Sequence, residues 1–123
     1  MRLRTWILYF DFYTPVIIAN NTFLAEEPET ARAFLDAVSR GYEFAIEHPR
    51  EAGEILCKAA PELDPDLVKA SQEYLADKYQ ADAPQWGYID QERWDAYYAW
   101  LNEKGLTETP IEAGTGCSNE YLP

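Results

Sequence analysis

The chain has strand-type composition only in its first 19 residues, and this feature limits its fold more than any other. Segments 5–10 (TWILYF) and 14–19 (TPVIIA) are rich in the β-branched and aromatic residues that favour strands. The second is a continuous apolar run, typical of a strand covered on both faces, with Pro15 at its start or edge. Two strands alone form no stable sheet. They must pair with a partner chain or belong to a larger α/β protein.

The sequence that follows predicts helices with clear start and stop signals. Asn20 and Asn21 are expected to stop the second strand and cap a short helical turn. Apolar residues then recur at three- and four-residue spacing from Pro28 onwards, which predicts a long amphipathic helix. This helix is expected to end at His48 and Pro49, and the next helix starts at once from Pro49.

Two further helices complete the predicted pattern. In LDPDLV, Asp64 is the expected cap and Pro65 the first residue of a helix that runs to about Tyr79. The last helix follows Asp90 and ends at Gly105. The predicted fold class is α/β and helix-dominated, with two short strands followed by four or five helices. We assign residues 1–106 to this domain and residues 107–123 to a loop-like tail.

Charge and cysteine content narrow the possible functions. The 123 residues include 22 acidic and 10 basic side chains, a formal net charge of -12. Nucleic acid is disfavoured as a partner because phosphate binding needs a basic surface, and so is an anionic membrane. Cys57 has the pattern of a buried free thiol, although a disulfide with Cys117 stays open. The start MRLRTWILYF resembles a secretory signal, but Asp11 interrupts its apolar run and no cleavage pattern follows, so there is no clear signal peptide.

No motif for catalysis, cofactor binding or metal binding is present. The sequence has neither a G-x-S-x-G elbow nor a P-loop, and its glycine-containing stretch 114–116 lies in the tail and not between strand and helix. A single histidine, His48, gives no metal-ligand spacing. We therefore expect a protein that is not an enzyme and has no cofactor, no metal and no catalytic residues.

Three side chains are candidates for ligand binding. Asp11 and Tyr13 stand where the second strand begins, and open α/β sheets place ligand-binding groups at strand ends. A carboxylate accepts hydrogen bonds from amino groups and a phenol offers a stacking face, which suits a small heteroaromatic amine. The alternative is an exposed turn acid and a packed tyrosine. Trp86, in the loop QADAPQWGYID, is either a buried loop anchor or a weaker candidate for a cleft wall, and the stripe Trp94, Tyr97, Tyr98, Trp100 is expected to be structural.

Over roughly residues 10–106 the sequence resembles a known family. The phrases YTPVIIAN, RAFLDAVSRGYEFAIEHPREA and WGYID are similar to the C-terminal third of the thiamine-precursor (pyrimidine) binding family. These substrate-binding proteins serve ABC importers and have the type II periplasmic-binding fold. The resemblance implies a partial lobe, an extracytoplasmic location, a pyrimidine-like ligand, an ABC permease as partner, and Asp11 and Tyr13 near the cleft. The chain lacks the family's N-terminal two-thirds, and the cysteine-rich segment and histidine of the related synthases do not appear in it.

Two functions follow from these features. The first is a solute-binding component of an ABC importer, as a fragment or truncated homologue. The alternative is a non-enzymatic assembly protein that forms a homodimer through its exposed strands and apolar helix faces.

Overall fold

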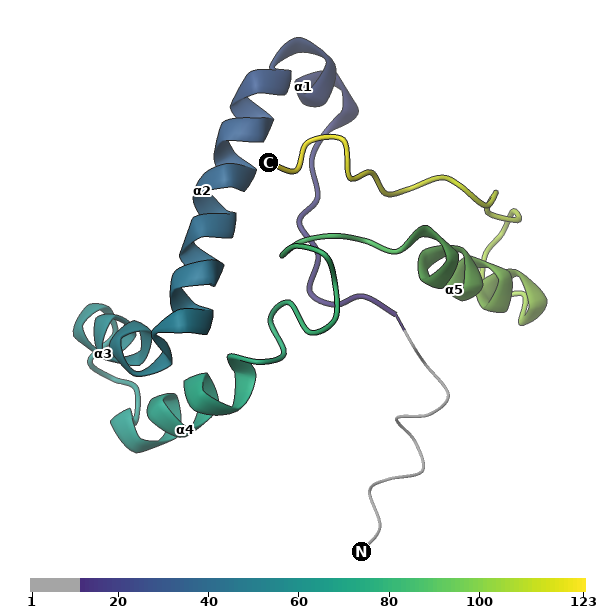
Figure 1. Cartoon of the computed structure of the whole chain (residues 1–123). Helices are drawn as coiled ribbons and strands as arrows, with labels where there is room; N and C mark the ends of the chain where they lie inside the picture. The colour runs from purple at the N-terminus through teal and green to yellow at the C-terminus, as the bar shows by residue number, and fades with distance from the viewer. Residues whose placement is uncertain (1–11) are drawn as a thin grey trace, which may run out of the picture. The chain divides into compact units, whose positions relative to one another are not determined.

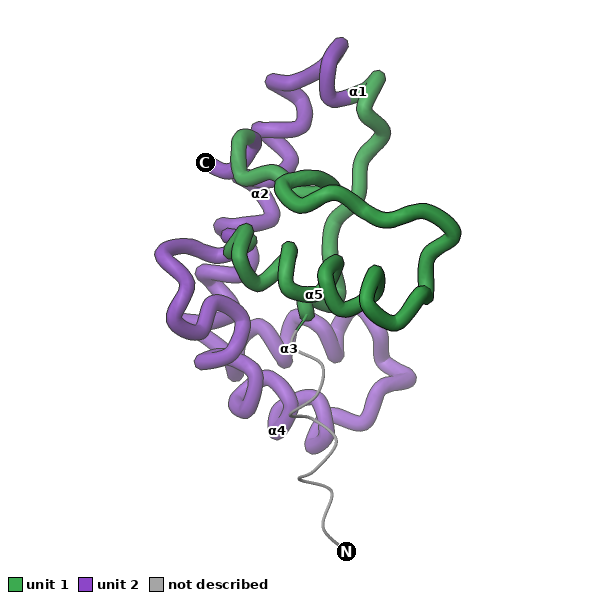
Figure 2. Tube along the Cα trace, turned by 90° about the vertical axis from the view of Figure 1, so that its right-hand side faces the viewer, with its two compact units in different colours: residues 1–23, 89–120 green, residues 24–88, 121–123 purple. Residues whose placement is uncertain are grey.

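The computed structural model describes residues 12–123, and every regular element in that range is a helix (Figure 1). The helices are α1 (Asn21–Glu26), α2 (Pro28–Glu47), α3 (Pro49–Ala59), α4 (Pro65–Leu75) and α5 (Gln91–Glu103). The chain divides into two compact units, shown in different colours in Figure 2. Within the described range, unit 1 comprises residues 12–23 and 89–120, and unit 2 comprises residues 24–88 and 121–123.

The prediction of an α/β fold is wrong for the described residues, which contain no strand. Residues 14–19 form no regular structure, and Val16, Ile17 and Ile18 are 41%, 53% and 87% exposed. The composition of this segment favours a strand, but a strand is stabilised only by hydrogen bonds and packing from its neighbours. No such neighbour lies among residues 12–123. The other predicted strand, 5–10, falls outside the described range.

The predicted helix starts are confirmed, because each depends on local chemistry. The caps use a side-chain oxygen that accepts a backbone N–H of the first turn. Asn20 accepts from Thr22 at 2.8 Å, Asp64 from Asp66 and Leu67 at 2.9 and 3.2 Å, and Asp90 from Arg93 at 2.8 Å. Proline occupies the first position of α2, α3 and α4, where its missing N–H costs no helical hydrogen bond.

The helix ends agree less closely with the sequence pattern. α2 stops at Glu47 and His48 separates it from α3, as predicted. α4 stops at Leu75, short of the predicted Tyr79, and the chain continues in turns. α5 stops at Glu103, and Gly105 follows with φ +62°, the left-handed conformation that commonly terminates helices.

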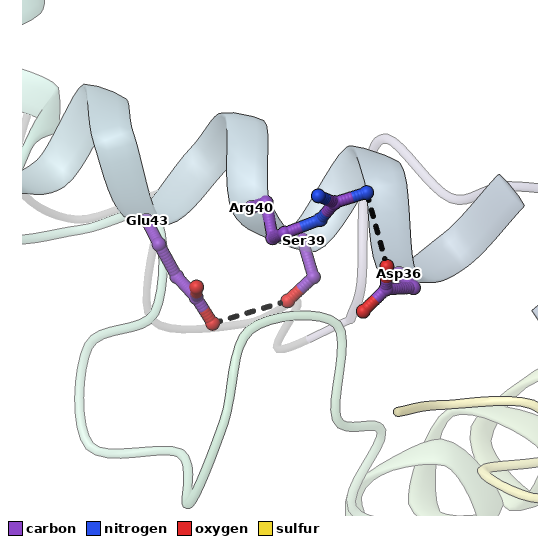
Figure 3. A network of polar contacts seen from close by, with 4 residues as sticks. All are labelled: Asp36, Ser39, Arg40 and Glu43. Atoms are coloured by element: carbon purple, nitrogen blue, oxygen red, sulfur yellow. Dashed lines mark hydrogen bonds and ion pairs between the residues drawn. The ribbon is translucent and has the colours of Figure 1, made fainter. Parts of the chain in front are cut away.

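Unit 2 is built by α2, α3 and α4, with α3 packed on both of the others. Gly53 of α3 is buried where α4 approaches: a Cβ there would lie 3.5 Å from Val68 Cγ1. Arg50 of α3 forms an ion pair with Glu73 of α4 at 2.8 Å. α2 carries its own polar network, in which Ser39 donates to Glu43 at 3.4 Å (Figure 3) and Arg40 pairs with Asp36 at 3.1 Å.

The buried core among the described residues is small. The buried side chains are Ala31, Ser39 and Val68, and no large side chain is fully enclosed. Many large apolar residues are exposed instead. In unit 2 they include Phe34, Phe44, Ile55, Leu56, Leu67 and Tyr74, and in unit 1 they include Phe12, Ile17, Ile18 and Leu106.

Replacing either helical glycine of unit 2 by alanine should raise the free energy of unfolding by about 0.5–1 kcal/mol, because glycine is a poor helix former. At Gly53 the new methyl meets Val68 and Gln72 at ordinary contact distances, and at Gly41 it meets nothing within 4 Å. Urea unfolding of Gly53→Ala and its matched control Gly41→Ala measures both values. Destabilisation by Gly53→Ala alone would contradict the observed α3–α4 spacing.

Three further features bear on function. No helix in the described part of the chain is long and apolar enough to span a bilayer. Residues 12–123 contain no group of three or more side chains placed to hold a metal ion. Cys57 and Cys117 are both free thiols, so the structure has no disulfide between them.

Candidate functional site: an aromatic pocket on α5

Tyr13 is held at the N-terminus of α5 by three different contacts. Its hydroxyl oxygen accepts the backbone N–H of Asp90 at 3.0 Å, and Asp90 is the residue that caps α5. The Arg93 guanidinium lies over its ring, 4.3 Å from the centroid. The Trp94 ring stacks alongside with 6.4 Å between centroids. Tyr13 is thus half-buried and fixed, with its orientation set by residues almost eighty positions later in the sequence.

Tyr13 belongs to a cluster of aromatic rings from two segments of unit 1. Phe12 stacks on Tyr97 at 5.0 Å, and Trp94 meets Tyr98 edge-to-face at 5.7 Å. The spacing of positions 94, 97 and 98 puts these three residues on one face of the helix. Together the five rings line a cavity of about 60 Å³, which we call the aromatic pocket. Its residues are Phe12, Tyr13, Trp94, Tyr97 and Tyr98.

The chemistry of the aromatic pocket suits a flat, uncharged group. Ring faces and edges favour stacked or edge-to-face contact with another aromatic ring. The volume is well below the roughly 300 Å³ at which pockets for whole small molecules begin, so the pocket accommodates a substituent or one edge of a small ring. The Trp94 Nε1 donor is buried and has no hydrogen-bond acceptor among the described residues. Buried donors without an acceptor are uncommon in folded proteins.

The tail following α5 runs back along the helix and is held there by hydrogen bonds. Asn102 bonds both the N–H and the carbonyl of Ile111, at 2.9 and 2.8 Å. Asn119 does the same for Ile89, at 2.9 and 2.8 Å. Between these two ends, the Asp95 carboxylate accepts the Gly114 N–H at 2.8 Å. We call residues 107–120 the tail strap; they contain no helix, and the domain boundary at 106/107 stays a prediction.

Cys117 lies within the tail strap and contacts α5. Its sulfur donates to Gln91 Oε1 at 3.5 Å. Burial raises the pKa of the Cys117 thiol, the Gln91 contact opposes this, and the nearby Asp95 charge adds to the rise. The thiol is therefore kept in its neutral form, which is the less reactive one.

Trp86 belongs to unit 2, where it packs against other aromatic side chains. Its ring stacks on Tyr42 at 4.3 Å, and Tyr42 meets Tyr79 edge-on at 5.1 Å. Tyr79 in turn donates to Gln72 at 3.2 Å. Tyr42, Gln72 and Tyr79 also line an open hollow of about 400 Å³ between α2, α3, α4 and the turn after α4. These contacts fit the alternative of a loop anchor, and a binding role for Trp86 stays a prediction.

The remaining candidate, Asp11, lies outside the described residues. Sequence reasoning assigned the aromatic stripe of α5 a structural role, and did not anticipate that it would form a pocket with Phe12 and Tyr13. The three- and four-residue spacing of the α5 aromatics was visible, but nothing local in the sequence links them to residues 12–13. The tail strap carried no sequence signal for its contacts.

Comparison with known proteins agrees with the resemblance to thiamine-precursor binding proteins. Residues 1–52 match the model of a family described as NMT1/THI5 like. The resemblance to thiamine-pyrimidine binding proteins, predicted from the sequence, is thereby confirmed.

Three curated relatives carry informative names. The chain is 29% identical over 102 residues to the formylaminopyrimidine-binding protein of Halalkalibacterium halodurans, covering 80% of the chain and 31% of the relative. It is 38% identical over 116 residues to the 4-amino-5-hydroxymethyl-2-methylpyrimidine phosphate synthase of Candida albicans, covering 90% and 31%. It is 24% identical over 124 residues to the riboflavin-binding protein RibY of Chloroflexus aurantiacus, covering 93% and 34%. The chain spans about a third of the length of these three relatives.

Proposed function

We propose that this chain, as a fragment or a truncated homologue, is a solute-binding component that binds a pyrimidine precursor of thiamine. The observation that carries the proposal is the match to the formylaminopyrimidine-binding protein across 80% of the chain. The aromatic pocket supports it, since a pyrimidine is a flat heteroaromatic ring and the pocket is lined by five aromatic side chains. Tyr13 is the residue that we propose contacts the ring, with Asp11 and Trp86 as further candidates.

In this proposal the protein is a carrier and not an enzyme. It captures the pyrimidine outside the cytoplasm and delivers it to an ABC permease. Two of the three relatives above are named as binding proteins, which supports binding without chemical conversion. The net charge of -12 supports a small-molecule ligand over nucleic acid as the partner.

A second candidate is pyrimidine phosphate synthesis, favoured by the 38% identity to the Candida synthase. A third is assembly: the exposed apolar side chains of residues 16–18 and of α2, α3 and α4 favour burial against a second copy of the chain. The synthase candidate and the assembly candidate predict different observations. A synthase forms a phosphorylated pyrimidine over time, whereas an assembly protein has a concentration-dependent mass and binds no pyrimidine.

Isothermal titration with 4-amino-5-hydroxymethyl-2-methylpyrimidine and with its formylaminomethyl analogue tests the proposal, with sedimentation on the same sample. We expect saturable binding that Tyr13→Ala weakens about tenfold, since a lost ring contact of about 1.4 kcal/mol has that effect. Tyr74→Ala is the matched control, because Tyr74 is an exposed tyrosine on α4, in unit 2. A folded protein that gives no binding heat would overturn the proposal, and a dimer without binding would favour assembly.

A further inference from the structure

Gly116 is where the tail strap comes against two side chains of the aromatic pocket. A Cβ built on Gly116 would collide with the Tyr98 hydroxyl and lie 3.1 Å from Tyr98 Cζ. It would also lie 3.4 Å from Trp94 Nε1. Gly116 has φ +81°, a conformation that residues with a Cβ rarely adopt. Both the space and the backbone at this position therefore require glycine.

The tail strap has little freedom to move away from such a collision. On one side Gly114 is hydrogen-bonded to the Asp95 carboxylate. On the other side Cys117 contacts Gln91, and Asn119 makes two hydrogen bonds with the backbone of Ile89. All of these anchors lie within unit 1. A side chain at position 116 would displace the ring of Tyr98 more readily than the anchored backbone.

Tyr98 transmits this displacement to the aromatic pocket because it lines the cavity and packs on Trp94. We propose that Gly116 is a specificity-determining position: its missing side chain lets the Tyr98 hydroxyl approach the strap, which fixes the Tyr98–Trp94 wall of the pocket. The width of the pocket, and so the ring substituent it admits, depends on that wall. The inference rests on the proposed function only in the choice of ligand.

Gly116→Ala and Gly114→Ala form a matched pair for the test. Both glycines are exposed and have positive φ, +81° and +76°, so alanine strains the backbone similarly at both. At Gly114, however, the new methyl meets nothing within 4 Å. The second matched change is Tyr98→Phe, which removes the hydroxyl that the Gly116→Ala methyl would meet. The double variant Gly116→Ala/Tyr98→Phe should therefore recover most of what Gly116→Ala loses, since only the milder contacts at 3.1 and 3.4 Å remain.

The first readout needs no ligand. The protein is labelled with 5-fluorotryptophan, and the ¹⁹F signal of Trp94 among the four tryptophans is assigned with Trp94→Phe. Gly116→Ala should shift this signal, Gly114→Ala should leave it in place, and the double variant should return it most of the way to the Tyr98→Phe position, because the methyl stays 3.4 Å from Trp94 Nε1. A Trp94 signal that responds equally to both alanines, or that the double variant fails to restore, would overturn the inference.

The second readout is the dissociation constant for 4-amino-5-hydroxymethyl-2-methylpyrimidine. Gly116→Ala should weaken binding about tenfold relative to Gly114→Ala, and Gly116→Ala/Tyr98→Phe should bind like Tyr98→Phe. Equal affinity of the two alanine variants would overturn the inference. If the unmodified chain binds no pyrimidine, the proposed function fails, and the fluorine signal alone then decides whether Gly116 sets the pocket wall.

Discussion

Replacing Trp94 by alanine should lower the free energy of unfolding by about 3 kcal/mol, the effect typical of removing a large packed aromatic side chain. The indole stacks beside Tyr13 and meets the edge of Tyr98, so its removal takes an aromatic contact from each of these two rings. It also enlarges an existing cavity of about 60 Å³, which the surrounding rings can refill only in part. Urea unfolding followed by circular dichroism measures the change.

Trp94→Phe is the control for this prediction. Phenylalanine keeps an aromatic ring in the cluster but removes the buried Nε1 donor, which has no acceptor among the described residues. Losing an unsatisfied donor offsets part of the lost contact area, so we expect a change within about 1 kcal/mol. A loss below about 1 kcal/mol for Trp94→Ala would show that the α5 stripe is not a packed cluster.

The helices could be predicted from the sequence because their signals are local. Asp64 and Asp90 cap α4 and α5 through hydrogen bonds to residues two or three positions away, and proline starts three helices at its expected place. These interactions depend on neighbouring residues only, so the pattern of the chain contains them in full. The end of α4 was less predictable, since no strong stop signal lies between Leu75 and Tyr79.

The strand prediction for residues 14–19 failed for the opposite reason. Val16, Ile17 and Ile18 have strand-type composition, but a strand needs partners that the segment itself does not specify. Among the described residues no partner is present, and Ile18 is almost fully exposed. The composition of residues 14–19 therefore indicates the structure that they favour when a partner strand is present, and not the structure that they form within residues 12–123.

The candidate site shows the same limit. The α5 stripe was visible as a face of the helix, whereas the hydrogen bond from Asp90 N–H to Tyr13 joins residues 77 positions apart. No rule based on the spacing of residues relates positions so far apart in the sequence. The contacts of Asn102, Asp95 and Asn119 with the tail strap were equally invisible, because a polar residue at a helix surface has many possible partners.

Asn102→Ala should lower the free energy of unfolding by about 2 kcal/mol and loosen the tail strap. The Asn102 amide pairs with both backbone groups of Ile111 and also accepts the Thr107 hydroxyl at 3.3 Å, so alanine leaves several half-buried polar groups unpaired, at about 1 kcal/mol each. Urea unfolding measures the loss, and cleavage after Glu112 by a glutamate-specific protease should become faster because the strap opens more often. Thr107→Val is the control, since it removes only the weakest of these contacts and should change the free energy by less than about 1 kcal/mol. Unchanged unfolding and unchanged cleavage in Asn102→Ala would mean that the strap is held by its other anchors, Asp95 and Asn119, and that Asn102 is dispensable.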